Sequence, residues 1–446
     1  LFDLTNPNAP IPQFVNAMKM AGIEVAGEQV IRNITFEARQ MVRRDTGINV
    51  MTETVVFGVY YVPAEQFGDE YVDLAGPYPL LIARKIETRG WTWKENTLID
   101  YDIGISDSIT SLPHLDISDP SAYQIFHQDA ARLVIADLFM INPYDNGFST
   151  VRSEKTISLV SWERALSVLN SKYPGRQLLF LHLLWGHPSL TPTWLINGQM
   201  SLEERKGFIE QYIRTVMPMI DHNQVVVANE PFTPNWEWAD KARILNDILG
   251  AAPSEWLPWA FKTAYDANPN ATLILNEFGI EASGSILFDD RKAHQMFTVI
   301  QQIQRQGIPV SVGFQMHINP QFERLNNFLT GLSAQIKKYQ QIGVPVIITE
   351  LDVRMDGKDL RDLPEAQRNL IQAQYYLGIA RVCGQGGVEL NLFGHSDRVS
   401  WLEEPVNGGS FARFTDPTVR QEDYSRKLSW YTLIKGFYET SFLNLR

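Results

Sequence analysis

From about residue 100 onward, eight short apolar runs alternate with longer amphipathic stretches. The apolar runs lie at 101–105, 133–136, 178–184, 225–228, 272–276, 310–315, 346–349 and 388–393. Runs of this length, rich in Val, Ile and Leu, are typical of strands buried on both faces of a parallel sheet. The stretches between them predict helices, chiefly at 161–169, 202–217, 257–268, 291–306, 325–341 and 364–382. This alternation indicates an α/β fold made of repeated βα units.

The number of predicted strands favours a closed barrel. Eight strands with helical connectors are what a (β/α)8 barrel requires. An open, doubly wound sheet is the alternative, and it would need a glycine-rich phosphate loop after its first strand. The residues at that position, Gly104-Ile105-Ser106-Asp107, do not form such a loop. The sequence therefore predicts a (β/α)8 TIM barrel over residues 98–446.

The first 97 residues have a different pattern of residue types. Runs of β-branched and aromatic residues at 54–62 and 80–86 are separated by turn residues such as Gly76-Pro77. We predict a small β-rich region over residues 1–97, either a separate module or a sheet packed on the barrel. Trp91 and Trp93 are spaced as on one face of a strand, and a role in core packing is favoured over sugar stacking.

Composition excludes several functional classes. The 446-residue chain has a net charge of −12 and contains no Lys/Arg run, so neither nucleic acid nor an anionic membrane is an expected partner. The single cysteine, Cys383, excludes an internal disulfide, and no Cys/His spacing suggests a metal site. No stretch is long and apolar enough to span a membrane. These properties describe an acidic globular protein with a sizeable core.

Two of the predicted strands end abruptly in a glutamate. Glu230 follows Asn229 at the end of the run at 225–228, and Glu350 follows the run at 346–349, two residues before Asp352. The carboxyl ends of barrel strands carry the chemistry in (β/α)8 enzymes. Glycoside hydrolysis uses two carboxyl groups that flank the scissile bond. Either glutamate alone is best explained as a solvated residue past a strand, but the two together indicate an active site.

Motifs on five predicted strands, in matching order, resemble glycoside hydrolase family 10, whose characteristic members are retaining endo-β-1,4-xylanases. The motifs lie at 181–185 with 191–195, 229–230, 313–317, 348–352 and 392–401, after the third, fourth, sixth, seventh and eighth strands. The resemblance extends from about residue 100 to the carboxyl terminus and leaves out residues 1 to about 97. It implies a barrel enzyme that hydrolyses β-linked polysaccharide.

The resemblance also implies roles for individual residues. Glu230 matches the general acid/base, and Glu350 matches the nucleophile. Asn229 matches the residue that hydrogen-bonds the sugar 2-hydroxyl. His317 and Asp352 match the pair that positions and charges the nucleophile. A retaining mechanism needs these two carboxyl groups about 5–5.5 Å apart, one ionised to attack and one protonated to release the leaving sugar.

Further matches surround the same catalytic subsite. Gln315 matches a polar residue of that subsite, and Trp401 matches an aromatic residue that walls it. Trp185 belongs to the third-strand motif. His182 is the preferred match for the subsite histidine of the family, with His187 as the alternative because the spacing in this loop requires gaps.

The chain departs from the family pattern at two places. Phe393 stands where a tryptophan is usual. The Glu-Asn-x-x-Lys cluster that binds sugars on the non-reducing side of the cut is missing from residues 136–142, where Leu138 and Phe139 occur. Asp137, Asn142 and the pair 154–155 are incomplete substitutes. The catalytic groups therefore match the family, whereas the pocket on the non-reducing side differs.

The leading hypothesis is a retaining endo-β-glycanase that acts on β-1,4-xylan. The alternatives are a retaining hydrolase of another β-linked or decorated polysaccharide and a non-catalytic carbohydrate-binding barrel, against which the paired carboxylates argue. No cofactor is implied, because protonation and covalent catalysis need only side chains here. We expect an extracellular location, although no signal peptide is visible in this sequence.

Overall fold

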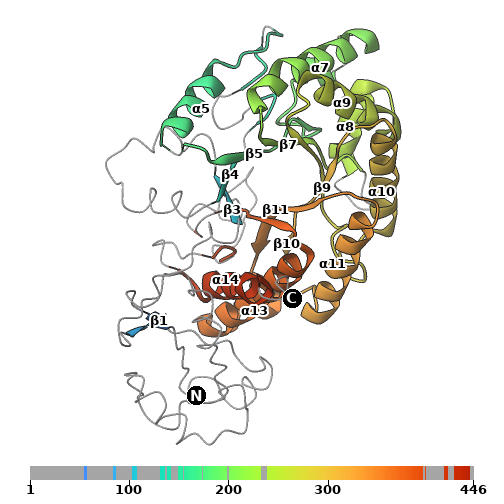
Figure 1. The fold of residues 1–446 in the computed structure, drawn as a ribbon. Helices are drawn as coiled ribbons and strands as arrows, with labels where there is room; N and C mark the ends of the chain where they lie inside the picture. The colour runs from blue at the N-terminus through green and yellow to red at the C-terminus, as the bar shows by residue number, and fades with distance from the viewer. Residues whose placement is uncertain are drawn as a thin grey trace, which may run out of the picture.

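The computed structural model describes residues 55–57, 84–86, 103–107, 131–135, 138–141, 149–153, 155–172, 174–197, 200–232, 239–394, 397, 416–419 and 426–441. Within these residues, parallel strands form a barrel with helices packed around it (Figure 1). The barrel strands are β3 (Ile103–Asp107), β4 (Arg132–Ile135), β5 (Gln177–Phe180), β7 (Gln224–Asn229), β8 (Thr272–Glu277), β9 (Ser311–Phe314), β11 (Val346–Val353) and β12 (Glu389–Leu392).

These eight described strands close into a ring. Each pairs in parallel with the next along the chain, and β12 pairs with β3 through Leu390↔Ile103 and Leu392↔Ile105. The closing pair confirms the (β/α)8 barrel and excludes the open sheet. Two short strands extend its carboxyl end: β6 (Leu184–Trp185) pairs with β7, and β10 (His317–Ile318) pairs with β11.

All eight predicted strands are present with their ends shifted by up to two residues, except that two strands differ more at their carboxyl ends. The run at 178–184 is interrupted, because Leu181 donates its N–H to Ile135 of β4 whereas Leu183 donates to Val226 of β7. The chain thus changes partner around His182, and β6 is a separate element. Strand β11 continues past its predicted end because β10 pairs with its last residues, including Asp352.

The predicted helices are also present and alternate with the strands. They are α5 (Val160–Lys172), α7 (Leu202–Val216), α9 (Pro253–Ala267), α10 (Asp290–Arg305), α11 (Leu325–Gln340) and α13 (Glu365–Gly386). Additional helices are α6 (Thr193–Ile196), α8 (Ala239–Leu249), α12 (Lys358–Arg361), α14 (Leu428–Ser441) and the 3-10 turn η5 (Met217–Ile220). Local signals fix some of the ends: Ser201 and Glu204 form a capping box before α7, and Gly387 ends α13 at φ 61°.

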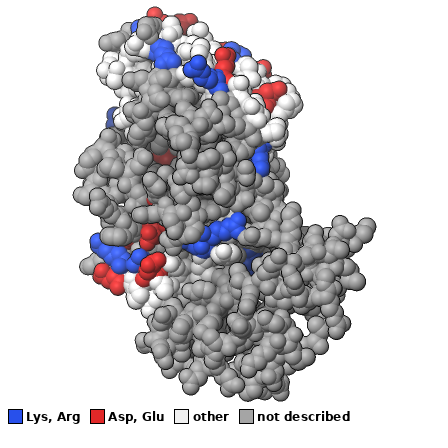
Figure 2. All heavy atoms as spheres, turned by 90° about the vertical axis from the view of Figure 1, so that its left-hand side faces the viewer, with Lys and Arg blue, Asp and Glu red and all other residues white. Residues whose placement is uncertain are grey.

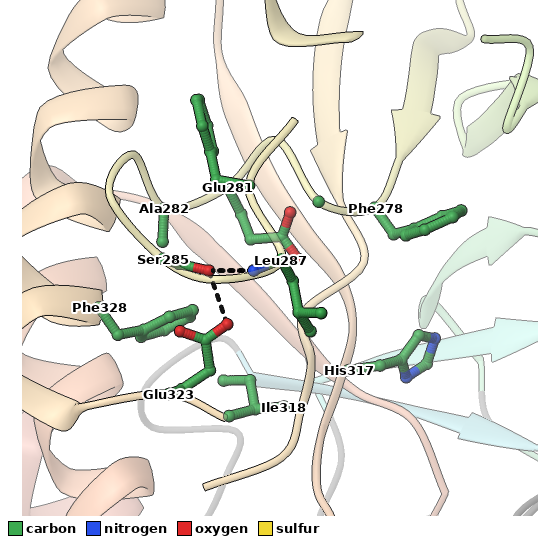
Figure 3. Close-up of a pocket in the computed structure, with 11 residues that line it drawn as sticks. Phe278, Glu281, Ala282, Ser285, Leu287, His317, Ile318, Glu323 and Phe328 are labelled. Atoms are coloured by element: carbon green, nitrogen blue, oxygen red, sulfur yellow. Dashed lines mark hydrogen bonds between the residues drawn. The ribbon is translucent and has the colours of Figure 1, made fainter. Parts of the chain in front are cut away.

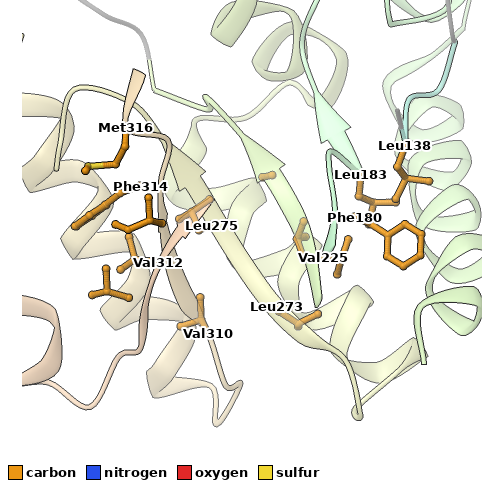
Figure 4. Packing of buried hydrophobic residues seen from close by; sticks show 14 of the residues in the cluster. Leu138, Phe180, Leu183, Val225, Leu273, Leu275, Val310, Val312, Phe314 and Met316 are labelled. Atoms are coloured by element: carbon orange, nitrogen blue, oxygen red, sulfur yellow. The ribbon is translucent and has the colours of Figure 1, made fainter. Parts of the chain in front are cut away.

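The buried apolar residues form an inner and an outer layer. The inner layer lies inside the barrel and takes residues from several strands: Val134, Leu179, Leu181, Val226, Ile274 and Ile347. The outer layer packs the other face of the strands against the helices. Figure 4 shows part of it, with Leu273, Leu275, Val312 and Phe314 on the neighbouring strands β8 and β9. Because successive strand residues point to opposite faces, burial on both faces explains the continuous apolar runs.

Polar side chains close the amino-terminal end of the barrel. Arg132, the first residue of β4, is 2% exposed and donates from Nη1 to Asn391 Oδ1 at 3.1 Å. Its Nη2 lies 3.1 Å from Glu389 Oε2. The same carboxylate oxygen accepts a 2.8 Å hydrogen bond from Gln224 Nε2. Strands β4, β7 and β12 are therefore joined by a charged network at the end opposite the predicted site.

Little of the first 97 residues is described. Strands β1 (Val55–Phe57) and β2 (Arg84–Ile86) fall within the runs predicted at 54–62 and 80–86, and they pair antiparallel. Trp91 and Trp93 lie outside the described residues. The division into a β-rich region at 1–97 and a barrel at 98–446 stays a prediction. In the part of the chain that is described, no helix combines the length and apolarity needed to cross a bilayer.

Candidate active site

A register irregularity in β7 turns Asn229 into the mouth of the barrel. The pairing of β7 with β8 shifts between Val226 and Ala228. Val226 packs in the inner layer, whereas Val227 and Ala228 both pack in the outer layer. The extra residue inverts the alternation of faces, as β-bulges next to active sites do. Asn229 therefore points inward, and Glu230 follows it with φ 48°.

A second irregularity turns Glu350 inward from β11. Ile347 packs in the inner layer, and both Ile348 and Leu351 pack in the outer layer. The pairing with β12 shifts between these last two residues, so Thr349 and Glu350 lie together on the inner side. Regular alternation would have placed Glu350 on the same face as Ile348, against the helices.

The carboxylate of Glu350 is 4% exposed and lies among three hydrogen-bonding side chains. Asn276 Nδ2 donates to its Oε1 at 2.7 Å, and His182 Nε2 lies 3.3 Å from the same oxygen. His317 Nε2 lies 3.2 Å from Oε2. Burial alone would raise the pKa of Glu350, but the hydrogen bonds and charges of His182 and His317 outweigh it and lower that pKa to about 2. Glu350 is therefore held as an anion.

His317 connects Glu350 to Asp352. Its Nδ1 lies 2.9 Å from Asp352 Oδ2, and the two residues are register partners of β10 and β11. Burial lowers the pKa of His317, but the charge and hydrogen bond of Asp352, with those of Glu350, raise it to about 10 overall. As an imidazolium at neutral pH, His317 donates one hydrogen bond to each carboxylate. This pair thus holds Glu350 in its charged form and in a fixed orientation.

Glu230 has a different environment. Gln315 Nε2 donates to its Oε1 at 3.0 Å, and Trp185 Nε1 donates to its Oε2 at 3.3 Å. Its backbone N–H donates to Asn276 O at 3.1 Å, which extends the pairing of β7 and β8 by one residue. Each oxygen of Glu230 thus meets a neutral donor, whereas Glu350 contacts two histidines. The two carboxyl groups are therefore differentiated as acid/base chemistry requires.

Two side-chain amides link the two carboxyl groups. Asn276 Nδ2 donates to Glu350 Oε1 and, at 2.9 Å, to Asn229 Oδ1. Gln315 Nε2 donates to the same Asn229 oxygen at 3.1 Å and to Glu230. With its oxygen occupied by these donors, Asn229 has a buried Nδ2 that finds no acceptor among the described residues. This amide donor is available to a hydroxyl group of a bound molecule.

Asn276 is a site residue that the sequence analysis did not single out. Thr349 Oγ1 donates to its Oδ1 at 2.7 Å, which orients the amide with Nδ2 toward Glu350. A signal was present, because the run at 272–276 also ends in an Asn-Glu pair, Asn276-Glu277, like Asn229-Glu230. Three apolar runs in the sequence are therefore closely followed by a glutamate, and only the structure distinguishes the surroundings of the three glutamates.

Aromatic rings line one side of the site. The ring of Trp185 lies 5.0 Å from that of His182 and 5.2 Å from that of His187. Of the two histidines, His182 contacts Glu350, so the preferred match is the one that the structure brings into the site. Phe139 lies 6.3 Å from His182 and 6.1 Å from Trp185 between ring centroids. An apolar ring thus packs beside two aromatic residues of the site, in the segment where the sequence analysis expects the polar cluster to be missing.

The eighth strand contributes Phe393. Its ring meets His317 edge to face at 5.4 Å and packs on the inner apolar layer. Trp401, predicted to wall the catalytic subsite, lies outside the described residues, as do Asp137 and Asn142. Lys155 Nζ lies over the ring of Trp194, 5.4 Å from the centroid.

A cavity of about 120 Å³ adjoins His317. Apolar side chains line much of it, among them Phe278, Leu287, Ile318 and Phe328. Figure 3 shows Ser285 next to Glu323 and Leu287; Ser285 Oγ donates to Glu323 Oε1 at 2.6 Å and accepts from Leu287 N at 3.2 Å. Burial raises the pKa of both Glu281 and Glu323. The hydrogen bond ties the loop after β8 to the loop before α11 beside the site.

The described residues contain no group of three or more His, Cys, Asp and Glu side chains suited to hold a metal ion. On the face shown in Figure 2, the described Lys and Arg side chains lie interspersed with Asp and Glu. The expectations of no metal, no cofactor, no nucleic acid and no membrane partner stay predictions. The site itself offers one anionic carboxylate, one carboxyl group with neutral donors and a free amide donor.

Comparison with known proteins agrees with this geometry. The family model "Glycosyl hydrolase family 10" matches residues 126–435. The chain is 26% identical over 277 residues to an endo-1,4-beta-xylanase of Agaricus bisporus, a match that covers 61% of this chain and 75% of the relative. It is 25% identical over 249 residues to endo-1,4-beta-xylanase A of Thermoanaerobacterium saccharolyticum, covering 50% of this chain but 19% of that protein. The chain thus spans a minor part of some curated relatives.

The fold has close counterparts among solved structures. Xylanase 10B of Thermotoga petrophila, solved in complex with xylobiose, superimposes with a TM-score of 0.62 at 20% identity, covering 78% of this chain and 98% of that one. At this identity the similarity establishes the fold alone. The family model, however, matches more than half of the chain, and the matched region contains the barrel strands from β4 to β12 and both glutamates. The chain belongs to glycosyl hydrolase family 10.

Proposed function

We propose that this protein is a retaining endo-β-1,4-xylanase that works by double displacement. The observation that carries the proposal is the contrast between two carboxyl groups. Glu350 is fixed as an anion by His182, Asn276 and His317, whereas the described donors to Glu230, Gln315 and Trp185, are neutral. The two groups come from the carboxyl ends of β11 and β7, where barrel enzymes hold their chemistry. A retaining glycosidase needs two such different carboxyl groups, one ionised to attack and one protonated to release the leaving sugar.

In the first step, Glu350 attacks the anomeric carbon of the bound sugar. The bond from that carbon to the glycosidic oxygen breaks, and Glu230 transfers its proton to the departing oxygen. In the second step, Glu230 takes a proton from water, whose oxygen displaces Glu350 from the sugar. Asn229 Nδ2, buried without an acceptor, donates to the sugar 2-hydroxyl in both steps. Gln315 holds Asn229 and Glu230 in a fixed relation.

Xylan is the proposed substrate because of the relatives. Two of them are named endo-1,4-beta-xylanases, and the Thermotoga petrophila structure holds xylobiose. Phe139, beside His182 and Trp185, favours a second candidate, a xylan or related β-linked polysaccharide with side chains. An apolar ring there offers fewer hydrogen bonds to an unsubstituted backbone sugar than a polar cluster does. We also propose an extracellular location, since polysaccharides do not cross membranes.

The stereochemistry of the product tests the mechanism. Proton NMR of the first sugar released from a β-linked xylo-oligosaccharide should show the β anomer, because two displacements restore the starting configuration. An initial α product would contradict the role of Glu350 as nucleophile. A panel of xylan, arabinoxylan, glucan and mannan, assayed in parallel, identifies the substrate. Binding of xylan with no release of sugar would instead support a carbohydrate-binding barrel.

A further inference from the structure

Behind Glu230 lies a buried ion pair that the proposed mechanism does not use. Glu277, the last residue of β8, is 0% exposed, and Lys292 on α10 is 1% exposed. Lys292 Nζ lies 2.8 Å from Glu277 Oε1. It also donates to Phe278 O at 2.8 Å and lies 3.5 Å from the centre of the Phe278 ring. Because strand neighbours point to opposite faces, Asn276 reaches the barrel mouth while Glu277 points toward α10.

Glu277 contacts the turn that follows Glu230. Its Oε2 accepts a hydrogen bond from Phe232 N at 3.4 Å, and the adjacent Asn276 O accepts one from Glu230 N at 3.1 Å. These two hydrogen bonds bracket Glu230 and Pro231. Glu230 has a φ of 48°, in the left-handed region that side-chain-bearing residues rarely adopt. Such a conformation persists where its surroundings hold it, and here end residues of β8 do so.

Glu277 also supports the side chain that contacts the carboxyl group of Glu230. Gln315 N donates to Glu277 O at 3.2 Å, and Gln315 Nε2 donates to Glu230 Oε1 at 3.0 Å. Glu277 is thus linked to Glu230 along two routes, one through Phe232 and one through Gln315. Burial raises the pKa of Glu277 to about 7 against the opposing charge of Lys292, with a smaller rise from Glu230, so the two glutamates lie within electrostatic range.

We propose that Glu277, anchored by Lys292, is a positioning residue that holds the turn at 230–232 and thereby aims the carboxyl group of Glu230 at the leaving oxygen. The inference rests on the proposed function, because it assigns the proton transfer to Glu230. It predicts a defect confined to the step that needs this proton. A residue with a purely structural role would instead affect every substrate in the same way.

Two matched double variants separate the hydrogen bond from the charge. Glu277→Leu/Lys292→Met removes both charges and the acceptor for Phe232 N. Glu277→Gln/Lys292→Met removes the same charges but keeps a carbonyl oxygen at that place. Changing both partners avoids leaving one buried charge without a counterion, which would be strongly destabilising. Comparing the two variants therefore isolates the contact with the turn.

The test compares two aryl β-xylobiosides that differ in leaving group. Phenolate needs a proton from Glu230 to depart, whereas 2,4-dinitrophenolate leaves without one. For the Leu/Met variant we expect kcat/KM on the phenyl substrate to fall about 10- to 100-fold, because a positioned acid supplies about 10²–10⁴-fold and the variant loses part of it. On the dinitrophenyl substrate kcat/KM should stay within about threefold of wild type. The Gln/Met variant should stay within about threefold of wild type on both.

An equal loss on both substrates, or no loss on either, would overturn the positioning role. Thermal unfolding and covalent labelling of Glu350 with a 2-fluoro dinitrophenyl glycoside give the fraction of folded, competent enzyme. If the Leu/Met variant does not fold, Glu277→Asp shortens the side chain at constant charge and should show the same selective loss. Glu230→Ala is assayed alongside. If Glu230→Ala loses kcat/KM equally on the phenyl and the dinitrophenyl substrate, the proposed function itself is refuted. If Glu230→Ala loses more on the phenyl substrate but the Glu277 variants do not, only the positioning role of Glu277 is refuted.

Discussion

At the scale of single residues, the site separates two carboxyl groups by what each of them contacts. Glu350 meets two histidines and an amide, and its pKa falls to about 2 although it is buried. Glu230 meets an amide and an indole N–H. In the proposed mechanism, the neighbours, and not the glutamate side chain itself, therefore determine which group serves as nucleophile and which as acid.

Removing either carboxylate should abolish hydrolysis without unfolding the chain. We expect Glu350→Gln and Glu230→Gln each to lower xylan hydrolysis by at least about 10²–10⁴-fold, because each removes a group that forms or breaks a bond to a proton or to carbon. In Glu350→Ala, added azide or formate should restore turnover with inverted product. Circular dichroism checks the fold, and near-wild-type activity in either Gln variant would contradict the assignment.

The charge of His317 should make the free energy of unfolding depend on pH. Its pKa rises from 6.5 to about 10 in the folded protein, so the charged imidazolium stabilises the folded state. This stabilisation is complete below pH 6.5 and is lost as the pH rises through about 10. The free energy of unfolding of wild type minus that of His317→Gln should therefore be largest at pH 5–6.5 and decline toward pH 10. Urea unfolding across this range measures it. A difference that grows with pH would show that His317 is neutral in the folded state.

At the scale of elements, the barrel has a catalytic end and a structural end. The carboxyl ends of β7, β8, β9 and β11 converge on the two glutamates, whereas the amino ends of β4, β7 and β12 meet at Arg132 and Glu389. Both ends contain buried polar networks. Their consequences differ, because the carboxyl-end network leaves Asn229 Nδ2 without an acceptor among the described residues, so that this donor can bind another molecule.

Breaking the network at the structural end should cost stability and spare catalysis. Arg132→Met leaves Glu389 without its described cation. Loss of one partner from a buried pair costs about 3–5 kcal/mol, and because Glu389 is 17% exposed we expect a loss at or below the lower end of that range. The double variant Arg132→Met/Glu389→Gln should recover a large part of that loss. Urea unfolding measures both, with kcat/KM on xylan as the control. A double variant no more stable than the single one would show that Arg132 acts mainly through Asn391 and Gln177.

At the scale of the whole molecule, the altered pocket on the non-reducing side should govern substrate length. Leu138 is fully buried, and Phe139 packs on His182 and Trp185 where the family pattern has a polar cluster. Each missing hydrogen bond to a sugar hydroxyl is worth about 0.5–1.5 kcal/mol. Several together predict a loss of about 10²-fold on short substrates, unless sugars beyond the cut contribute binding.

Specificity constants across linear xylo-oligosaccharides of increasing length measure this effect. We expect xylobiose- and xylotriose-type substrates to be poor and long or side-chain-bearing polymers to be good. Equal rates on short oligosaccharides and on polymer would show that residues elsewhere bind the non-reducing side. A variant that lacks residues 1–97, assayed on the same polymers if it folds, would show whether that region contributes to binding.

The sequence by itself determined the strands, their order and the identity of most site residues. The barrel strands whose burial is described are buried on both faces, so each apolar run can be recognised from its own residues, together with the residue that ends it. Glu230, Glu350, Asn229, Gln315, His182, Trp185, His317, Asp352 and Phe393 lie around one barrel mouth for this reason. The sequence does not identify Asn276 as a site residue, because its role depends on contacts with Thr349 and Asn229, which are far away along the chain.

Tertiary structure alone decided which way those residues point. Alternation along β11 would have turned Glu350 toward the helices with Ile348, and only the shift in pairing with β12 turns it into the barrel. The shift in β7 does the same for Asn229. The three strand-end glutamates look alike in sequence, but Glu277 faces Lys292 on α10. Register is a property of two paired strands, so one strand's sequence does not contain it.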